Sequence, residues 1–144
     1  MGISLQVTFD CANPDRVAQF WAMALDYKIQ DPPPGFASWP DFLKAQNIPE
    51  EKWDSASALV DPEGKGPRLY FQKVPEGKAV KNRVHLDVNV GGGRATPEPE
   101  RRQRTNQKVE QLLGAGAIKV GEFSQMGESW IVMQDPEGNE FCLQ

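Results

Sequence analysis

The sequence predicts an α+β protein built from two successive modules, each containing a strand, a helix and three further strands. Strands in which apolar and polar residues alternate open both halves, at 3–11 and at 84–90. The tetrapeptide Asp-Pro-Glu-Gly occurs at 61–64 and again at 135–138, each time between the last two strands of its half. A duplication this regular specifies the architecture of the fold.

The first module opens with strand 3–11, whose apolar residues share the face that we expect to be buried. A helix should follow, because Asn13 is a favourable N-cap and Pro14 a favourable first residue, and apolar residues recur at helical spacing to about Asp26. Trp21 lies on the apolar stripe of this helix and is expected in the core. The remaining strands of this module are expected at 27–30, 55–60 and 67–74, the last two forming a hairpin.

An irregular stretch at 32–54 interrupts the first module. It contains a predicted short helix at 41–46 between two prolines, and four aromatic residues: Phe36, Trp39, Phe42 and Trp53. A loop this long inside a compact domain is more often functional than idle. We expect either the wall or lid of a pocket, or a contact between subunits.

The second module opens with strand 84–90, which carries the only histidine of the chain. Its valines and leucine should pack on one face, and its polar residues, Arg83, His85, Asp87 and Asn89, should share the other. A helix is expected at 99–113, solvated in its charged first half and docked by its apolar second half. The arginines of its first half alternate with glutamates and indicate a solvated face. Further strands are expected at 118–123, 130–134 and 140–144.

Length and charge limit the class of protein. A chain of 144 residues predicts one domain, with module one at about 1–75 and module two at about 82–144. The net charge of −4 and the scattered basic residues argue against a nucleic-acid partner. No apolar run suits a membrane span and no basic and apolar leader is present, so we expect a cytoplasmic protein without a membrane partner. The two cysteines, Cys11 and Cys142, are expected to be reduced and buried.

The chain resembles the vicinal oxygen chelate superfamily, and within it the branch of glyoxalase-like, bleomycin resistance and dioxygenase proteins. The resemblance covers nearly the whole chain except 32–54. The motifs that carry it are Phe9-Asp-Cys-Ala-Asn-Pro14, Phe20-Trp21, Val84-His-Leu-Asp87 and Asp135-Pro-Glu-Gly-Asn-Glu-Phe-Cys-Leu143. It implies two βαβββ modules that form a curved mixed sheet around a shared cavity, with helices on the outer faces. A homodimer is expected on the same ground.

Metal-dependent members of this superfamily take His, Glu or Gln ligands from the first and last strand of each module. Carried over by register, these positions are Gln6 and His85 on the opening strands, and Tyr70 and Cys142 on the closing strands. A phenol and a thiol must each lose a proton to ligate, which makes them poor replacements for glutamate. We therefore favour a metal-free site. The alternative is a register shifted by two residues, in which Gln6, His85 and Glu140 hold one divalent ion.

Without a metal, His85 and Asp87 are candidates for a general acid or base, although a histidine that only lines the pocket is the simpler interpretation. Arg68 could hold an anionic ligand or could be a surface charge. Cys142 is interpreted as an inert buried thiol. Trp130 is a candidate wall of the pocket.

Two functions follow from this set of residues. The favoured prediction is a small-molecule-binding protein whose polar wall contains Gln6, Arg68, Tyr70, Trp130 and Cys142 together with the His85 and Asp87 pair. The alternative is a metal-dependent lyase, isomerase or dioxygenase. Whether the protein is an enzyme stays open at this point.

Overall fold

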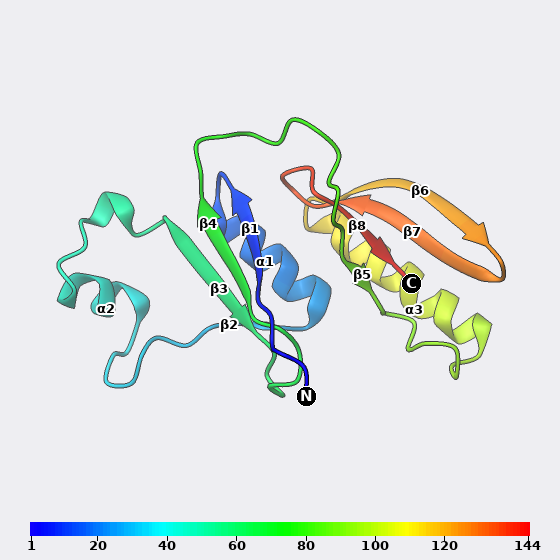
Figure 1. Ribbon diagram of the computed structural model, residues 1–144, viewed down its shortest axis with the longest axis horizontal. Helices are drawn as coiled ribbons and strands as arrows, with labels where there is room; N and C mark the ends of the chain where they lie inside the picture. Colours follow the sequence, from blue (N-terminus) through cyan, green and yellow to red (C-terminus); the bar gives the residue numbers. More distant parts are fainter. The chain divides into compact units, whose positions relative to one another are not determined.

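In the computed structural model, which describes residues 1–144, the chain forms two four-stranded mixed sheets and two long helices (Figure 1). It divides into two compact units: unit 1 comprises residues 1–22 and 26–77, and unit 2 comprises residues 23–25 and 78–144. The strand order is β1-β4-β3-β2 in unit 1 and β5-β8-β7-β6 in unit 2, which is the same arrangement used twice. The predicted α+β fold of two repeated modules is confirmed.

Unit 1 contains β1 (Val7–Cys11), all but the last three residues of α1 (Pro14–Leu25), β2 (Lys28–Ile29), α2 (Trp39–Ala45), a 3₁₀ turn (Glu50–Lys52), β3 (Ala56–Val60) and β4 (Leu69–Lys73). The helix α1 begins as predicted, because the Asn13 side chain accepts a hydrogen bond from the Arg16 amide at 3.2 Å. Its apolar stripe and the inner face of the sheet form the core of this unit: Val17, Phe20, Trp21, Leu59, Leu69 and Phe71. Trp21 is a core residue, as expected.

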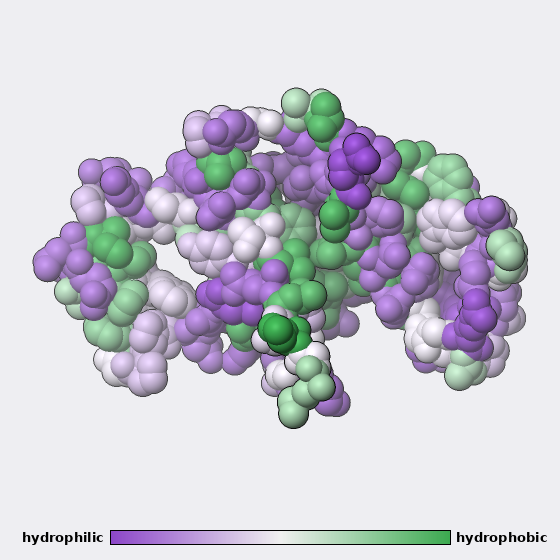
Figure 2. All heavy atoms as spheres, in the orientation of Figure 1, coloured by the Kyte–Doolittle hydropathy of each residue, from purple (hydrophilic) through white to green (hydrophobic).

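The opening strand is shorter than predicted. It starts at Val7 rather than at Ile3, and the side chains of Ile3 and Leu5 are 99% and 68% exposed instead of buried. The parallel pairing of β1 with β4 gives the reason, since Val7 lies opposite Leu69 and the position opposite Leu5 is Pro67. Proline has no amide hydrogen to donate to a neighbouring strand, so the ladder ends there. Figure 2 shows hydrophobic atoms at the surface where this N-terminal segment lies in Figure 1.

The irregular stretch 32–54 contains the expected short helix, α2, which begins two residues earlier than predicted because Ser38 Oγ accepts a hydrogen bond from the Asp41 amide. Phe42 meets the rings of Phe36 and Trp39 edge-on, so these three aromatic residues form a small cluster of their own. The Trp39 indole donates a hydrogen bond of 2.7 Å to the backbone oxygen of Gln30. That bond joins the stretch to the end of β2.

Unit 2 contains β5 (Asp87–Val88), α3 (Glu98–Gly114), β6 (Ile118–Gln125), β7 (Glu128–Gln134) and β8 (Glu140–Leu143). As predicted, α3 is solvated at first and docked later, with Thr105, Val109 and Leu112 buried. The buried residues of the sheet in this unit are Ile131, Met133, Phe141 and Leu143. No helix of the structure is both long enough and apolar enough to span a bilayer.

The strand predicted at 84–90 is reduced to Asp87–Val88. Val84 is 82% exposed and does not pack as expected. In the parallel pairing of β5 with β8, Asp87 lies opposite Cys142, so position 84 falls opposite Asn139, before β8 begins. At the other end, the Val90 amide turns back to the Val88 oxygen. The partner strand β8 is therefore too short to pair with the whole of the strand predicted at 84–90.

The two Asp-Pro-Glu-Gly turns fold alike. In each, the aspartate accepts a hydrogen bond of 2.9 Å from the amide two residues later, Glu63 after Asp61 and Glu137 after Asp135. The glycine amide bonds to the aspartate carbonyl oxygen, again at 2.9 Å in both turns. Gly64 and Gly138 have positive φ angles of 70° and 85°, which non-glycine residues rarely adopt. The repeated tetrapeptide is therefore a repeated local structure.

Candidate functional site

The polar face of unit 2 brings together three of the predicted site residues. His85, Asp87 and Cys142 each offer one ligand atom within 4.8 Å of the others. The pairing of β5 with β8 causes this, because it sets Asp87 beside Cys142 and His85 precedes Asp87 by two positions. The His85 Nε2 lies 3.3 Å from Asp87 Oδ1, and the two side chains are 43% and 50% exposed. A bound molecule can therefore reach both groups.

The thiol of Cys142 is buried beneath this pair. Burial raises the pKa of Cys142, and the negative charge of Asp87 and its hydrogen bond with the thiol raise it further. A thiol with a raised pKa stays protonated at neutral pH and is a weak nucleophile. The structure thus agrees with the interpretation of Cys142 as an unreactive thiol, and both cysteines are buried and form no disulfide, as expected.

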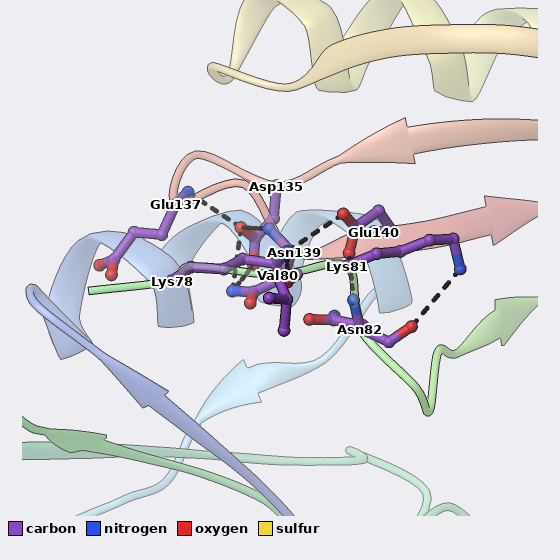
Figure 3. A network of polar contacts seen from close by, with 8 residues as sticks. All are labelled: Lys78, Val80, Lys81, Asn82, Asp135, Glu137, Asn139 and Glu140. Atoms are coloured by element: carbon purple, nitrogen blue, oxygen red, sulfur yellow. Dashed lines mark hydrogen bonds and ion pairs between the residues drawn. The ribbon is translucent and has the colours of Figure 1, made fainter. Parts of the chain in front are cut away.

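Glu140 belongs to a different set of contacts, shown in Figure 3. Its Oε1 lies 3.0 Å from Lys78 Nζ, and its Oε2 accepts a hydrogen bond of 2.9 Å from the Asn82 amide. Burial raises the pKa of Glu140, but these two bonds outweigh it and lower the pKa to about 2. Both carboxylate oxygens are therefore already engaged by the segment that leads into β5.

The polar face of unit 1 gathers the other predicted residues around Arg68. Its Nη1 donates a hydrogen bond of 2.8 Å to Gln6 Oε1, and its Nε donates one of 2.7 Å to Gln30 Oε1. The guanidinium carbon lies 5.4 Å from the centre of the Tyr70 ring. Three of the predicted residues, Gln6, Arg68 and Tyr70, thus meet on one face.

The charge of Arg68 has no carboxylate partner. Both oxygens that orient the guanidinium are neutral amide oxygens, and the ring beneath it is also neutral. A planar guanidinium held in place with its charge uncompensated suits bidentate binding of a carboxylate or phosphate group. This arrangement can bind an anion that reaches it from solvent.

The residues of unit 1 do not fit the metal of the metal-dependent relatives. Gln6 Oε1, the oxygen that would ligate, accepts its hydrogen bond from a cation, and Tyr70 lies under the same cation. A divalent ion placed there would be repelled by the guanidinium. In unit 2 the donors are an imidazole, a carboxylate and a thiol that holds its proton, while Glu140 is occupied by Lys78.

Trp130 lies on β7 and lines a groove of about 430 Å³ in unit 2, where its ring stacks on Phe123 with the ring centres 6.3 Å apart. Sequence reasoning missed three residues of these surroundings: Gln30, Lys78 and Arg101. Gln30 and Lys78 are 38 and 62 positions from their partners, and no local pattern marks such contacts. Arg101 was assigned to a solvated face, yet its Nε is buried.

The comparison with known proteins leads to the same family that the sequence resembles. The family described as glyoxalase-like domain matches residues 6–144. No curated protein matches the sequence.

Solved structures share the fold at low sequence identity. A glyoxalase/bleomycin resistance protein/dioxygenase family enzyme from Burkholderia phytofirmans PsJN has a TM-score of 0.59 at 13% identity, with 96% of this chain and 94% of that chain covered. The fosfomycin resistance protein FosX from Listeria monocytogenes, in a complex with Mn(II) and 1S,2S-dihydroxypropylphosphonic acid, has a TM-score of 0.60 at 10% identity, covering 99% and 88%. The hypothetical protein SA1046 from S. aureus has a TM-score of 0.58 at 16% identity, covering 99% and 96%.

Proposed function

This chain belongs to the glyoxalase-like domain family, and we propose that it binds a small organic anion through Arg68 rather than through a metal ion. The observation that supports this most directly is the guanidinium itself, which is oriented by Gln6 and Gln30 and carries an uncompensated charge. Family members that use a metal place a cation on this face to attract substrate oxygens. Here the cation is the side chain of Arg68, just before the closing strand β4, which contacts Gln6 and Tyr70 at two of the family's ligand positions and would serve the same electrostatic purpose.

The surroundings of Arg68 suggest an anion with an apolar or aromatic body. Tyr70 presents its ring next to the guanidinium. Gln30, which orients Arg68 through its side chain, also accepts the Trp39 indole hydrogen bond through its backbone oxygen. The aromatic cluster of the 32–54 stretch is thereby tied to the residue that positions the charge. A ligand with a carboxylate or phosphonate on a ring would use both features.

Binding to Arg68 can be tested with benzoate and phenylphosphonate, with benzamide as the uncharged analogue. We expect the two anions to shift the Arg68 side-chain Nε–H resonance and the Leu69 and Tyr70 amides in NMR titrations, and benzamide to shift them far less. Arg68→Gln should weaken anion binding at least tenfold, which corresponds to about 1.4 kcal/mol. Arg16→Gln, which removes an exposed arginine of the same unit, is the matched control and should bind like the wild type. Equal titrations of wild type and Arg68→Gln would contradict the proposal.

A metal-dependent function is the second candidate, because His85, Asp87 and Cys142 come within 4.8 Å of one another. This set shares only His85 with the alternative drawn from the sequence, because Asp87 and Cys142 stand in place of Gln6 and Glu140. An imidazole, a carboxylate and a thiol favour zinc among common divalent ions, provided that the thiol loses its proton on binding. The family's metal chemistry would be to polarise a substrate oxygen.

Metal analysis separates the two candidates. The second requires a stoichiometric ion that disappears in both His85→Ala and Cys142→Ser, and a thiolate-to-metal absorption band when Co²⁺ is added. Protein that is free of metal, and that shows neither the band nor a thermal shift with Zn²⁺ or Co²⁺, would remove the second candidate and leave the Arg68 proposal standing.

A further inference from the structure

A groove of about 430 Å³ runs between α3 and the hairpin formed by β6 and β7, entirely within unit 2. Its volume falls in the range of small-molecule pockets, which is roughly 300–1,000 Å³. The residues that line it include Arg101 and Thr105 from α3, Ser124 from β6, and Ser129, Trp130 and Ile131 from β7. The groove thus offers two guanidinium groups, those of Arg101 and Arg102, together with several hydroxyl groups and the apolar side chain of Ile131.

The groove lies on the side of the sheet that α3 covers, not on the face that carries His85 and Cys142. Ile131 and Leu143 are paired and both buried, and they belong to the core beneath the helix. Val132 is paired with Cys142, and successive residues of a strand point to opposite faces. A ligand in this groove would therefore be separated by the sheet from a ligand on the polar face.

Arg101 is the residue that makes the groove unusual. Its Nε is buried and has no hydrogen-bond partner in the protein. Buried polar groups are nearly always satisfied, because an unmet donor costs about 1–3 kcal/mol. An acceptor bound in the groove would satisfy this one once the Arg101 side chain shifts to uncover its Nε.

The nearby carboxylates are already used by other residues. Glu98 pairs with Arg102 at 2.9 Å, and Glu122 pairs with Lys119 at 2.8 Å. Both carboxylates line the groove, yet neither bonds to Arg101. The positive charge of Arg101 is therefore the one that remains uncompensated among the charges that line it.

The base of the Arg101 side chain is held close to the backbone at Gly91. A Cβ atom added at Gly91 would lie 3.2 Å from Arg101 Cβ and 3.3 Å from its Cγ, closer than such atoms normally approach. Gly91 is itself fixed, since its amide donates a hydrogen bond of 2.9 Å to the Gln144 oxygen. The glycine gives the arginine its position beside the last strand.

We propose that this groove is a second binding site, which takes a small organic carboxylate. The carboxylate would accept hydrogen bonds from Arg101, the hydroxyls of Ser124 and Ser129 would bind polar groups of the ligand, and its apolar part would lie against Ile131. This site is independent of the anion site at Arg68, because it lies in the other unit and on the helix side of its sheet.

The proposal can be tested by ¹H–¹⁵N NMR titration with indole-3-acetate, using indole-3-acetamide as the neutral analogue. We expect the acetate to shift the amides of Arg101, Thr105 and Ser129 in a saturable way, and the neutral analogue to shift them at least tenfold more weakly. Arg101→Gln should abolish the preference for the anion, and Arg101→Lys should restore part of it. Arg104→Gln is the matched control, since Arg104 lies on the same helix, pairs with Glu100 and does not line the groove.

The outcomes distinguish this site from the one at Arg68. Shifts at Arg101 that persist in Arg68→Gln support the groove whatever the result at Arg68. Shifts confined to Tyr70 and Leu69 would overturn the groove proposal while supporting the proposed function. If Arg101→Gln unfolds the protein, Ser129→Phe, which fills the groove without removing the charge, supplies the same test: binding that survives it overturns the proposal.

Discussion

At the scale of single residues, the protonation state of the Glu140 carboxyl affects the stability of unit 2. Its two oxygens hold Lys78 and the Asn82 amide, and its pKa is lowered to about 2 from a usual value of 4.5. A carboxyl whose pKa is lower in the folded state than in the unfolded state stabilises the fold above the unfolded pKa. That contribution should be complete above about pH 4.5 and should disappear as the pH falls toward about 2.

We predict that Glu140→Gln lowers the free energy of unfolding at pH 7 by about 1–3 kcal/mol, the usual effect of losing hydrogen bonds to a charged group. Urea unfolding of the variant and the wild type, at pH 7 and at low pH, measures this difference in the free energy of unfolding. The difference between the variant and the wild type should shrink at the low pH, where the wild-type carboxyl is also protonated. Glu110→Gln, at an exposed position of α3, should change little at either pH. A difference independent of pH would show that packing, and not charge, explains the loss.

A second prediction at this scale concerns Cys142, whose pKa is raised by burial and by Asp87 above its usual value of 9.0. In a Cys11→Ser background, the ultraviolet absorbance of the thiolate should appear only at alkaline pH. Asp87→Asn removes the negative charge beside the thiol, so the midpoint should move to lower pH. Asp10→Asn is the control, because Asp10 lies in unit 1 and bonds to Gln72. A midpoint that does not move in Asp87→Asn would rule out this electrostatic contact.

At the scale of elements, the two Asp-Pro-Glu-Gly turns share a structure but not an environment. Asp135 is 2% exposed and accepts hydrogen bonds from the Glu137 amide and from both the amide and the side chain of Asn139. Asp61 makes similar bonds, to amides only, but it lies nearer the surface. Removal of the aspartate should therefore lower the free energy of unfolding more in the second turn than in the first.

We expect Asp135→Ala to lower the free energy of unfolding by about 2–3 kcal/mol, because it leaves several donors without a partner. Asp61→Ala should cost clearly less, since water can replace the lost carboxylate. Chemical denaturation of the two variants measures the difference. Equal losses in the two turns would mean that burial does not determine the strength of this motif.

The elements also show what sequence patterns can and cannot predict. Helix α1 was predicted well because Asn13 and Pro14 are local signals, and the repeated turns were predicted for the same reason. The strands 3–11 and 84–90 were predicted too long, because alternation is local whereas pairing is not. Their lengths depend on Pro67 and Asn139, residues far away in the sequence.

The same distinction applies to the candidate site. Counting from the turns put Cys142 in one site with His85, Gln6 and Tyr70, and the structure brings Cys142 near His85 and Asp87 while Gln6 and Tyr70 lie around Arg68. It could not predict that Arg68 would be oriented by Gln30, because Gln30 lies at the end of a two-residue strand that is paired only through β3. Nor could it predict the Lys78 and Glu140 pair, which joins the segment before β5 to β8.

At the scale of the whole molecule, the N-terminal segment provides a reason to expect a homodimer. Strand β1 is an edge strand, and the residues that precede it continue its alternation with Ile3 and Leu5 exposed. An edge strand with apolar residues and unpaired backbone groups is a template for pairing with another chain. A second copy of the chain could supply the backbone hydrogen-bond partner that this segment lacks opposite Pro67.

We predict that the protein is dimeric in sedimentation experiments and that Ile3→Ser combined with Leu5→Ser shifts it toward monomer. The physical reason is that burying two large aliphatic side chains contributes several kcal/mol to association, at about 1.5–3 kcal/mol each. Val80→Ser, which removes another exposed aliphatic residue far from β1 in the sequence, should leave the dimer intact. A wild-type protein that stays monomeric at all accessible concentrations would contradict the prediction. A dimer that survives the double substitution would place its interface elsewhere, and the aromatic cluster of the 32–54 stretch would be the next surface to change.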